Sequence, residues 1–267
     1  MGLAALGFAL AAAVLHAVWN LLLRDTRDTE AAAAVAVVVF VAVLAPFAAA
    51  TWSVESAAWK YVVPSAALEL VYIALLAAAY RRFDLSLVYP IARGLAPVAA
   101  LAIVVVVAGA SPSAAEIGGV LVVAAGVLLV RGARGGRGGA FGLLIALVIG
   151  GYTVIDGYGI QHAGTFAYAF LIMLGAAVFY PPFVGVRRVR AAVSPTTILV
   201  GVLSAGAYLF VLLALRRASA PAVSAVRETS VVIAAALAAV FLHERVGRAR
   251  FAGAILVAAG VALLALA

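Results

Sequence analysis

The chain repeats itself at an offset of 134 residues, the difference between positions 93 and 227. The segment Val123-Ala124-Ala125-Gly126-Val127 returns letter for letter as Val257-Ala258-Ala259-Gly260-Val261, and Arg93 returns as Arg227. Self-similarity at a fixed offset indicates one structural unit written twice. Each copy also holds an arginine inside an apolar stretch, an expensive place for a charge. The repeat therefore predicts two similar halves, and the arginines indicate where function resides.

Composition places this chain in a membrane. Of 267 residues, 68% are hydrophobic and only 10% are charged, and the mean hydropathy is +1.25. Soluble domains carry about 25% charged residues. Apolar runs long enough for a bilayer core of about 30 Å follow one another to the end of the chain. A multi-pass membrane protein is predicted, and its short connections cannot house a folded active site.

The apolar runs predict ten membrane-spanning helices, five in each copy of the repeat. Because an odd number of crossings turns the second copy upside down, the predicted fold is an all-α integral membrane protein of two inverted five-helix repeats. Residues 1–133 form the first repeat, 134–139 a basic glycine-rich linker, and 140–267 the second repeat. The expected spans are 2–23, 31–51, 59–80, 85–108, 113–131, 140–161, 164–186, 195–215, 219–242 and 247–266.

Charge in the connections predicts the orientation. Thirteen arginines lie in the connections on one side, whereas Lys60, Arg216 and Arg217 lie on the other. Because basic loops stay in the cytoplasm, both termini are predicted to lie outside. Arginine at almost every basic position, with abundant alanine, valine and glycine, indicates a GC-rich bacterial genome and hence the bacterial cytoplasmic (inner) membrane. The thirteen arginines are 24, 27, 81, 82, 131, 134, 137, 187, 188, 190, 245, 248 and 250.

Five charged residues remain inside the predicted spans: Glu69, Arg93, Asp156, Arg227 and Glu228. An unpaired charge at mid-membrane costs about 2.5–3.5 kcal/mol on insertion scales, so these groups should face one another or a wet cavity. Three carboxylates against two guanidiniums leave a formal charge of minus one. That imbalance favours a protonated carboxyl group, or a cation in the site.

Polar and aromatic side chains accompany the charges at helical spacing, three or four residues apart on one helix face. We expect Arg93 and Arg227 to bind substrate together with a set of uncharged partners. Each partner also has a plain alternative, since a tyrosine can pack with its hydroxyl satisfied, a histidine can bond a backbone carbonyl, and Arg227 and Glu228 can lock two helices together. The partners are His16, Asn20, Tyr72, Tyr89 and Tyr152.

The carboxyl groups are candidates for proton coupling. Desolvation favours the protonated form of a carboxyl group, whereas a neighbouring guanidinium favours the charged form. The acid least paired with arginine is therefore the best proton carrier. Glu69 is the first candidate, because it lies near the middle of its span and its repeat counterpart is Ser204. Asp156 is the second candidate, and Glu228 belongs to the same group.

Several classes of protein are disfavoured. With no cysteine and with histidines scattered at positions 16, 162 and 243, the sequence predicts neither a metal site nor a cofactor. The net charge of +8 and the glycine-rich tract at 131–139 could indicate RNA binding, but a basic cytoplasmic loop accounts for both. An intramembrane enzyme is the alternative from another class, and the sequence disfavours it, since hydrolase and metalloprotease motifs are missing.

Several segments resemble the EamA-like branch of the drug/metabolite transporter superfamily. They are His16-Ala-Val-Trp19-Asn20, Tyr89-Pro-Ile-Ala-Arg93-Gly94, Arg227-Glu228-Thr-Ser230 and Leu242-His-Glu244-Arg245. The resemblance covers nearly the whole chain. One departure is visible, because the glutamate that members often carry after the fourth helix would fall near Ala110, whereas the second half keeps Glu244.

The resemblance implies a secondary transporter with a central cavity between its halves. We expect alternating-access, proton-coupled export of a small polar or zwitterionic, amino-acid-like metabolite. Uptake or exchange of a cationic or quaternary amine is the alternative that the acidic excess leaves open. The expected partners are the substrate, protons and the lipid bilayer, with no nucleic acid, and the protein is expected to be a monomer or a homodimer.

Overall fold

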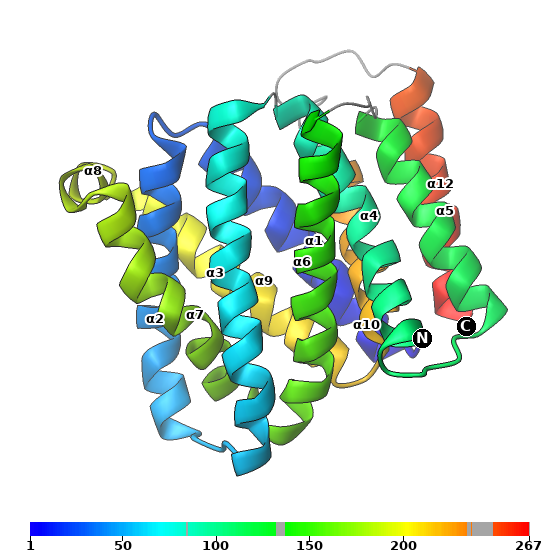
Figure 1. The fold of residues 1–267 in the computed structure, drawn as a ribbon, viewed down its shortest axis with the longest axis horizontal. Helices are drawn as coiled ribbons and strands as arrows, with labels where there is room; N and C mark the ends of the chain where they lie inside the picture. The colour runs from blue at the N-terminus through cyan, green and yellow to red at the C-terminus, as the bar shows by residue number, and fades with distance from the viewer. Residues whose placement is uncertain (84, 132–136, 234–235, 237–247, 267) are drawn as a thin grey trace.

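The computed structural model describes residues 1–267 apart from 84, 132–136, 234–235, 237–247 and 267. The side chains of Tyr89 and Pro90 also lie outside the described part. Long helices dominate the described residues (Figure 1). They are α1 (Leu3–Arg24), α2 (Thr29–Ala50), α3 (Trp59–Arg82), α4 (Leu85–Val106), α5 (Ala114–Arg131), α6 (Arg137–Gly159), α7 (Thr165–Val184), α8 (Val186–Ala191), α9 (Pro195–Leu215), α10 (Ala220–Arg227) and α12 (Arg248–Leu266), with short 3-10 turns η1 (Ser56–Ala58) and η2 (Ile160–His162).

The helices follow the predicted spans closely. Every predicted span coincides with described helical backbone, although for the ninth, 219–242, only the first part is described. Among the described residues, six helical segments are long and apolar enough to cross a membrane, and three shorter apolar helices occur in α4, α5 and α12. The protein is therefore a multi-pass membrane protein, whereas the inverted relation of its halves stays a prediction. Both termini lie at the same end of the bundle (Figure 1).

Helix packing pairs the two halves of the chain. Helix α1 packs on α9, and α3 packs on α6. Helix α2 packs on α9, and α3 packs on α7. If each helix is replaced by its counterpart in the other half, the contact of α1 with α9 becomes that of α6 with α3, and the contact of α2 with α9 becomes that of α7 with α3. The contacts α2 with α7, α4 with α10 and α5 with α12 each join a helix to its own counterpart. The interface between the halves is thus the main packing surface of the protein.

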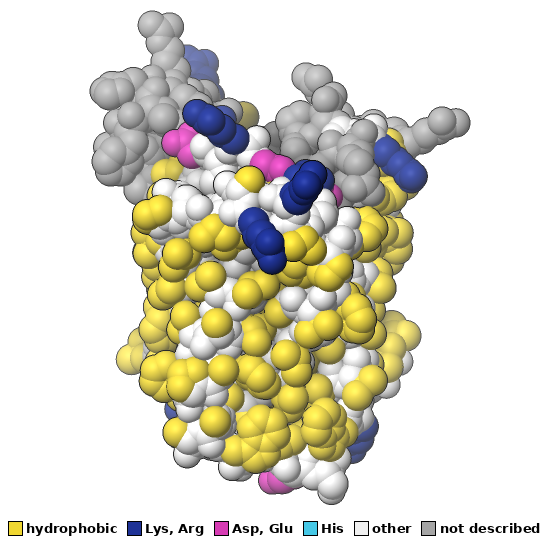
Figure 2. Space-filling view, turned by 90° about the vertical axis from the view of Figure 1, so that its left-hand side faces the viewer, with side chains coloured by type: hydrophobic (Ala, Val, Ile, Leu, Met, Phe, Trp, Pro, Cys, Tyr) yellow, Lys and Arg dark blue, Asp and Glu magenta, His cyan; other side chains and the backbone are white. Residues whose placement is uncertain are grey.

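The outer surface suits lipid. Figure 2 shows that the face formed by α2, α7 and α8 is covered by hydrophobic side chains, with charged side chains gathered at its two ends. Phe179 and Phe183 on α7 are 65% and 64% exposed, which in water would be costly for aromatic rings. Trp52 and Trp59 are also exposed and flank one connection, as interfacial residues do.

Glycines allow α5 and α12 to approach backbone to backbone. A Cβ atom added to Gly126 would lie 2.7 Å from the carbonyl oxygen of Gly253, and one added to Gly253 would lie 2.6 Å from that of Gly126. Gly119 and Gly260 form a second such crossing. Small residues permit this close contact in membranes. Gly118 on the same helix faces open space instead.

This packing gives a matched pair of substitutions. We expect Gly126→Ala to destabilise the protein by about 1–3 kcal/mol, because the new methyl group overlaps backbone that cannot move aside. Gly118→Ala, eight residues earlier on the same helix, should be neutral or slightly stabilising, since alanine favours helix more than glycine does. Thermal unfolding in detergent measures both. Equal unfolding temperatures for the two variants would contradict this account of the α5–α12 contact.

Helix α8 is held by an ion-pair cluster at the end of the bundle opposite the termini. Nη2 of Arg188 lies 2.9 Å from Oδ1 of Asp28 and 3.0 Å from Oε2 of Glu30, and its Nε donates to Oδ2 of Asp28 at 2.9 Å. The hydrogen bond from Arg188 holds the pKa of Asp28 below its usual value of 3.8. Gly185, with φ of 106°, provides the turn from α7 into α8.

The lowered pKa of Asp28 predicts how its contact with Arg188 depends on pH. A carboxyl group with a lowered pKa in the folded state stabilises the protein above its ordinary pKa, and this contribution is lost as the pH falls through the folded value. We therefore expect hydrogen exchange in α8 to accelerate below about pH 4. Arg188→Gln should accelerate the exchange already at neutral pH, whereas Arg187→Gln, on the adjacent exposed position, should not. Identical exchange in both variants would remove Arg188 as the anchor.

Candidate functional site

Arg93 and Glu228 form an ion pair between the two halves of the chain. Nε of Arg93 donates a hydrogen bond to Oε2 of Glu228 at 3.1 Å, and Nη2 lies 3.0 Å from Oε1. The side chains are only 4% and 2% exposed. Arg93 comes from α4 of the first half, and Glu228 directly follows α10 of the second half. The pair therefore neutralises two of the five interior charges and ties α4 to α10.

The helical ladder is interrupted at Glu228. Helix α10 ends at Arg227, Glu228 is in a turn, and helical backbone resumes over 229–233. The amide of Glu228 donates to the carbonyl of Ala225 at 3.0 Å, and the hydroxyl of Thr229 donates to the carbonyl of Val226 at 2.8 Å. Interrupted helices in membranes occur where backbone lines a binding site. The interruption places two charged side chains next to freed backbone groups.

Asp156 is enclosed by three hydroxyl groups. Its Oδ1 accepts hydrogen bonds from Ser65 at 2.5 Å and Tyr168 at 3.0 Å, and its Oδ2 accepts one from Tyr208 at 2.6 Å. The donors come from α3, α7 and α9, whereas Asp156 lies on α6 and is 1% exposed. Three hydroxyl donors can stabilise a buried carboxylate without a partner of opposite charge.

Glu69 and Arg227 are buried without a bonded partner in the part of the chain that the structure describes. Their exposed fractions are 4% and 8%. Glu69 interacts electrostatically with both Asp156 and Arg227, and Arg227 also interacts with Asp156. Since Arg93 and Glu228 cancel, these three residues carry the remaining net charge of minus one. This triad of Glu69, Asp156 and Arg227 has formal charge and hydrogen-bonding capacity left for a ligand.

Two of the predicted tyrosines adjoin the triad. Tyr152 is buried and interacts electrostatically with Glu69, Arg227 and Asp156. The ring of Tyr72 meets the ring of Tyr152 edge to face, with centroids 6.1 Å apart. The side chain of Tyr89, also predicted for this site, lies outside the described residues.

The predicted residues of α1 form their own local contacts. The Asn20 amide donates to the carbonyl of His16 at 2.7 Å, one turn earlier on the same helix. The rings of His16 and Trp19 are in edge contact, with centroids 4.7 Å apart. The Asn20 amide is therefore hydrogen-bonded within its own helix. The segment Leu242–Arg245, which contributed to the family resemblance, lies outside the described residues.

Sequence reasoning missed Tyr168 and Tyr208 as partners of Asp156. The signal for Tyr208 was present, because Ser204 and Tyr208 stand four residues apart in an otherwise apolar span and so share one helix face. Ser65 stands four residues before Glu69, so the same helical spacing places the two on one face. For Tyr168 no spacing distinguishes it from a packing residue.

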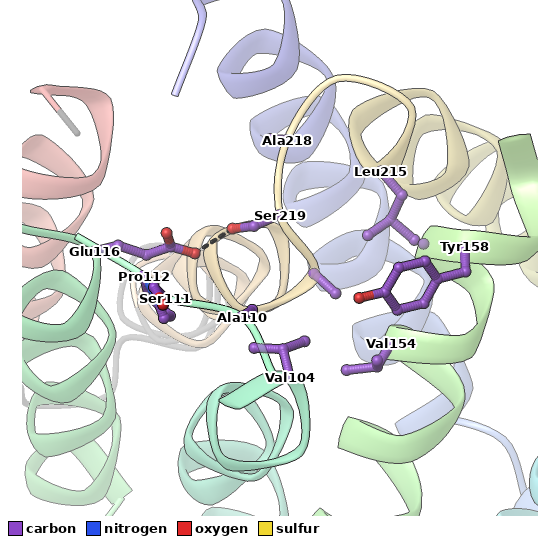
Figure 3. Close-up of a pocket in the computed structure, with 12 residues that line it drawn as sticks. Val104, Ala110, Ser111, Pro112, Glu116, Val154, Tyr158, Leu215, Ala218 and Ser219 are labelled. Carbon is purple, nitrogen blue, oxygen red and sulfur yellow. Dashed lines mark hydrogen bonds between the residues drawn. The ribbon is translucent and has the colours of Figure 1, made fainter. Parts of the chain in front are cut away.

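A cavity of about 290 Å³ opens near the end of the bundle that carries both termini. It lies between α4, the α4–α5 connection and the start of α5 on one side, and α6, the end of α9 and the start of α10 on the other (Figure 3). Its polar lining includes Glu116, Tyr158 and Ser219. The cavity therefore sits between the two halves of the chain.

Comparison with known proteins finds a family that matches the second half of the chain and a solved structure with a similar fold. The EamA-like transporter family matches residues 136–266. A solved structure titled "Crystal structure of protein" is 16% identical, covers 100% of this chain and 98% of its own, and has a TM-score of 0.77. This likeness shows a shared fold alone. No curated protein matches the chain.

Proposed function

The chain belongs to the EamA-like transporter family, which matches its second half, and we propose that it is a proton-coupled secondary transporter exporting a small polar or zwitterionic metabolite. Members of this family are membrane transporters rather than enzymes, so the open questions concern substrate, coupling and direction. The observation that carries the proposal is the triad of Glu69, Asp156 and Arg227, which is buried between the halves and has one more carboxyl group than guanidinium groups. The bacterial cytoplasmic membrane and outward-facing termini belong to the same proposal.

The roles of the triad follow from its contacts. Arg227 has no bonded partner among the described residues, so its guanidinium is the group available for a substrate carboxylate. Asp156 is already stabilised by three hydroxyl groups, which favours its remaining charged and attracting an amine. Glu69 lacks such donors in the described part of the protein and is the group best suited to exchange a proton. Tyr72 and Tyr152 would contact the apolar body of the substrate.

Alternating access draws on the packing of the halves. The contacts α1 with α9 and α3 with α6 exchange under a swap of the halves, as expected for inverted repeats that rock against each other. The Arg93–Glu228 pair crosses this interface. We propose that the pair holds the present conformation and that its two residues re-pair or take up a proton during the cycle. His16, Asn20 and Tyr89 are proposed as further contacts along the path.

Replacing Glu69 tests the proposal most directly. In proteoliposomes with an imposed pH gradient, Glu69→Gln should lose gradient-driven uptake of the exported metabolite but keep exchange across the membrane, because the neutral side chain resembles the protonated state. Glu55→Gln, whose carboxylate is 64% exposed outside the triad, is the matched control and should transport normally. Undiminished gradient-driven flux in Glu69→Gln would remove Glu69 from the mechanism.

The net charge of minus one also favours a second candidate, a carrier for a cationic or quaternary amine. The two candidates differ in what they need from Arg227, since a cation has no carboxylate to bind there. Counterflow inhibited by amino acids supports the zwitterion, whereas inhibition by choline alone supports the cation.

A further inference from the structure

Both polar and apolar side chains line the cavity near the termini. Glu116 from the start of α5 and Tyr158 from α6 line it, and in Figure 3 Tyr158 lies beside Leu215 and Val154, on the opposite side of the cavity from Glu116. Val104, Val154 and Leu215 supply the apolar side. A volume of about 290 Å³ accommodates a molecule of amino-acid size. Among the residues lining it, Glu116 is the one ionisable carboxylate.

A hydrogen bond joins the two halves beside this cavity. The hydroxyl of Ser219 donates to Oε1 of Glu116, so α5 of the first half is connected to the start of α10 in the second. Ser219 also caps α10, accepting from the amide of Ala222 at 3.4 Å. A ligand that takes over the Glu116 carboxylate would therefore compete with the contact between the halves.

Helix α10 connects the cavity with the charged centre. Ser219 and Ala220 line the cavity at the start of this helix, and Arg227 ends it. Seven residues of α-helix span about 10 Å. The cavity is thus about two helical turns from the triad of Glu69, Asp156 and Arg227, on the side of the bundle that the charge pattern places outside.

From this arrangement we propose that the cavity is a second binding site, specific for a small amine-bearing metabolite with an apolar side chain. The ammonium group is bound by the Glu116 carboxylate, and the Tyr158 ring, together with Val104, Val154 and Leu215, covers the apolar body. The site rests on the proposed function in one respect, because it names the chemistry of a substrate on its way between the triad and the outside.

The cysteine-free sequence permits a direct binding test. Ala218→Cys introduces a single thiol into the lining, and its labelling rate by a thiol reagent is measured on purified protein in detergent. Phenethylamine should slow labelling about tenfold at saturation, because a molecule bound in a pocket of this kind covers most of the lining. Phenylacetate has the same ring and chain length with the opposite charge and should not protect. Adding Glu116→Gln should abolish the protection by phenethylamine.

Each result bears on the proposal. Equal protection by phenethylamine and phenylacetate, or none by either, overturns it, as does protection that persists in Glu116→Gln. Ala110→Cys, on the opposite lining segment, repeats the measurement if Ala218→Cys does not fold. The assay involves neither flux nor a gradient. Loss of protection with normal proton-driven transport therefore refutes this site alone, whereas protection without proton-driven transport refutes the proposed function alone.

Discussion

Replacing Arg93 with methionine is expected to lower the free energy of unfolding by about 3–5 kcal/mol. The reason is the residue left behind, because Glu228 is 2% exposed and would lose the guanidinium that lies 3.0 Å from its Oε1. An uncompensated charge in this environment must acquire a proton or disrupt its surroundings. The measurement is unfolding in detergent followed by circular dichroism, with denaturant or heat.

The double variant Arg93→Met with Glu228→Leu separates the ion pair from the packing. Replacing both partners of a buried pair by apolar side chains is often neutral or stabilising, so most of the lost stability should return. Transport should not return, if the pair re-forms or takes up a proton during each cycle. A double variant as unstable as Arg93→Met would mean that the stabilisation comes from packing around the arginine and not from its charge.

The helices were predictable because hydropathy and length decide where a chain can cross a bilayer. For α9 the predicted bounds 195–215 coincide with the helix found, since a serine cap and Pro195 begin it and Arg216 follows its end. The short helix α8 escaped prediction, because six residues with three arginines have the composition of an ordinary basic loop. Its fold depends on the distant partners Asp28 and Glu30.

The partners of the interior charges were not predictable. Helical spacing shows which residues share a face, but it does not show which faces meet. Arg93 could have paired with any of three carboxylates, and only packing of α4 on α10 selects Glu228. The interruption of the helix at Glu228 was not predictable either, because the sequence has neither proline nor glycine at that position, whereas α4 continues through positions 90 and 97, both prolines.

Replacing Arg227 should mainly reduce transport, whereas replacing Arg93 should mainly reduce stability, although the two residues are repeat-related and both buried. We expect Arg227→Gln to lower transport of a carboxylate-bearing substrate about 10- to 100-fold, since a charge-assisted contact is worth about 1.5–3 kcal/mol and each 1.4 kcal/mol is a factor of ten. Stability should fall far less than in Arg93→Met, because no described residue bonds to the Arg227 guanidinium. Flux into proteoliposomes and thermal unfolding of the same preparations measure both effects.

Arg217→Gln provides the control, because that guanidinium is exposed and lies 5.1 Å from the Phe8 ring centroid, outside the triad. It should leave transport unchanged. A glutamine at 227 also changes the formal charge of the triad from minus one to minus two, so residual transport should shift toward amines that lack a carboxylate. If Arg227→Gln instead unfolds the protein while Arg93→Met merely stops transport, the two arginines have exchanged roles, and the substrate carboxylate binds at Arg93.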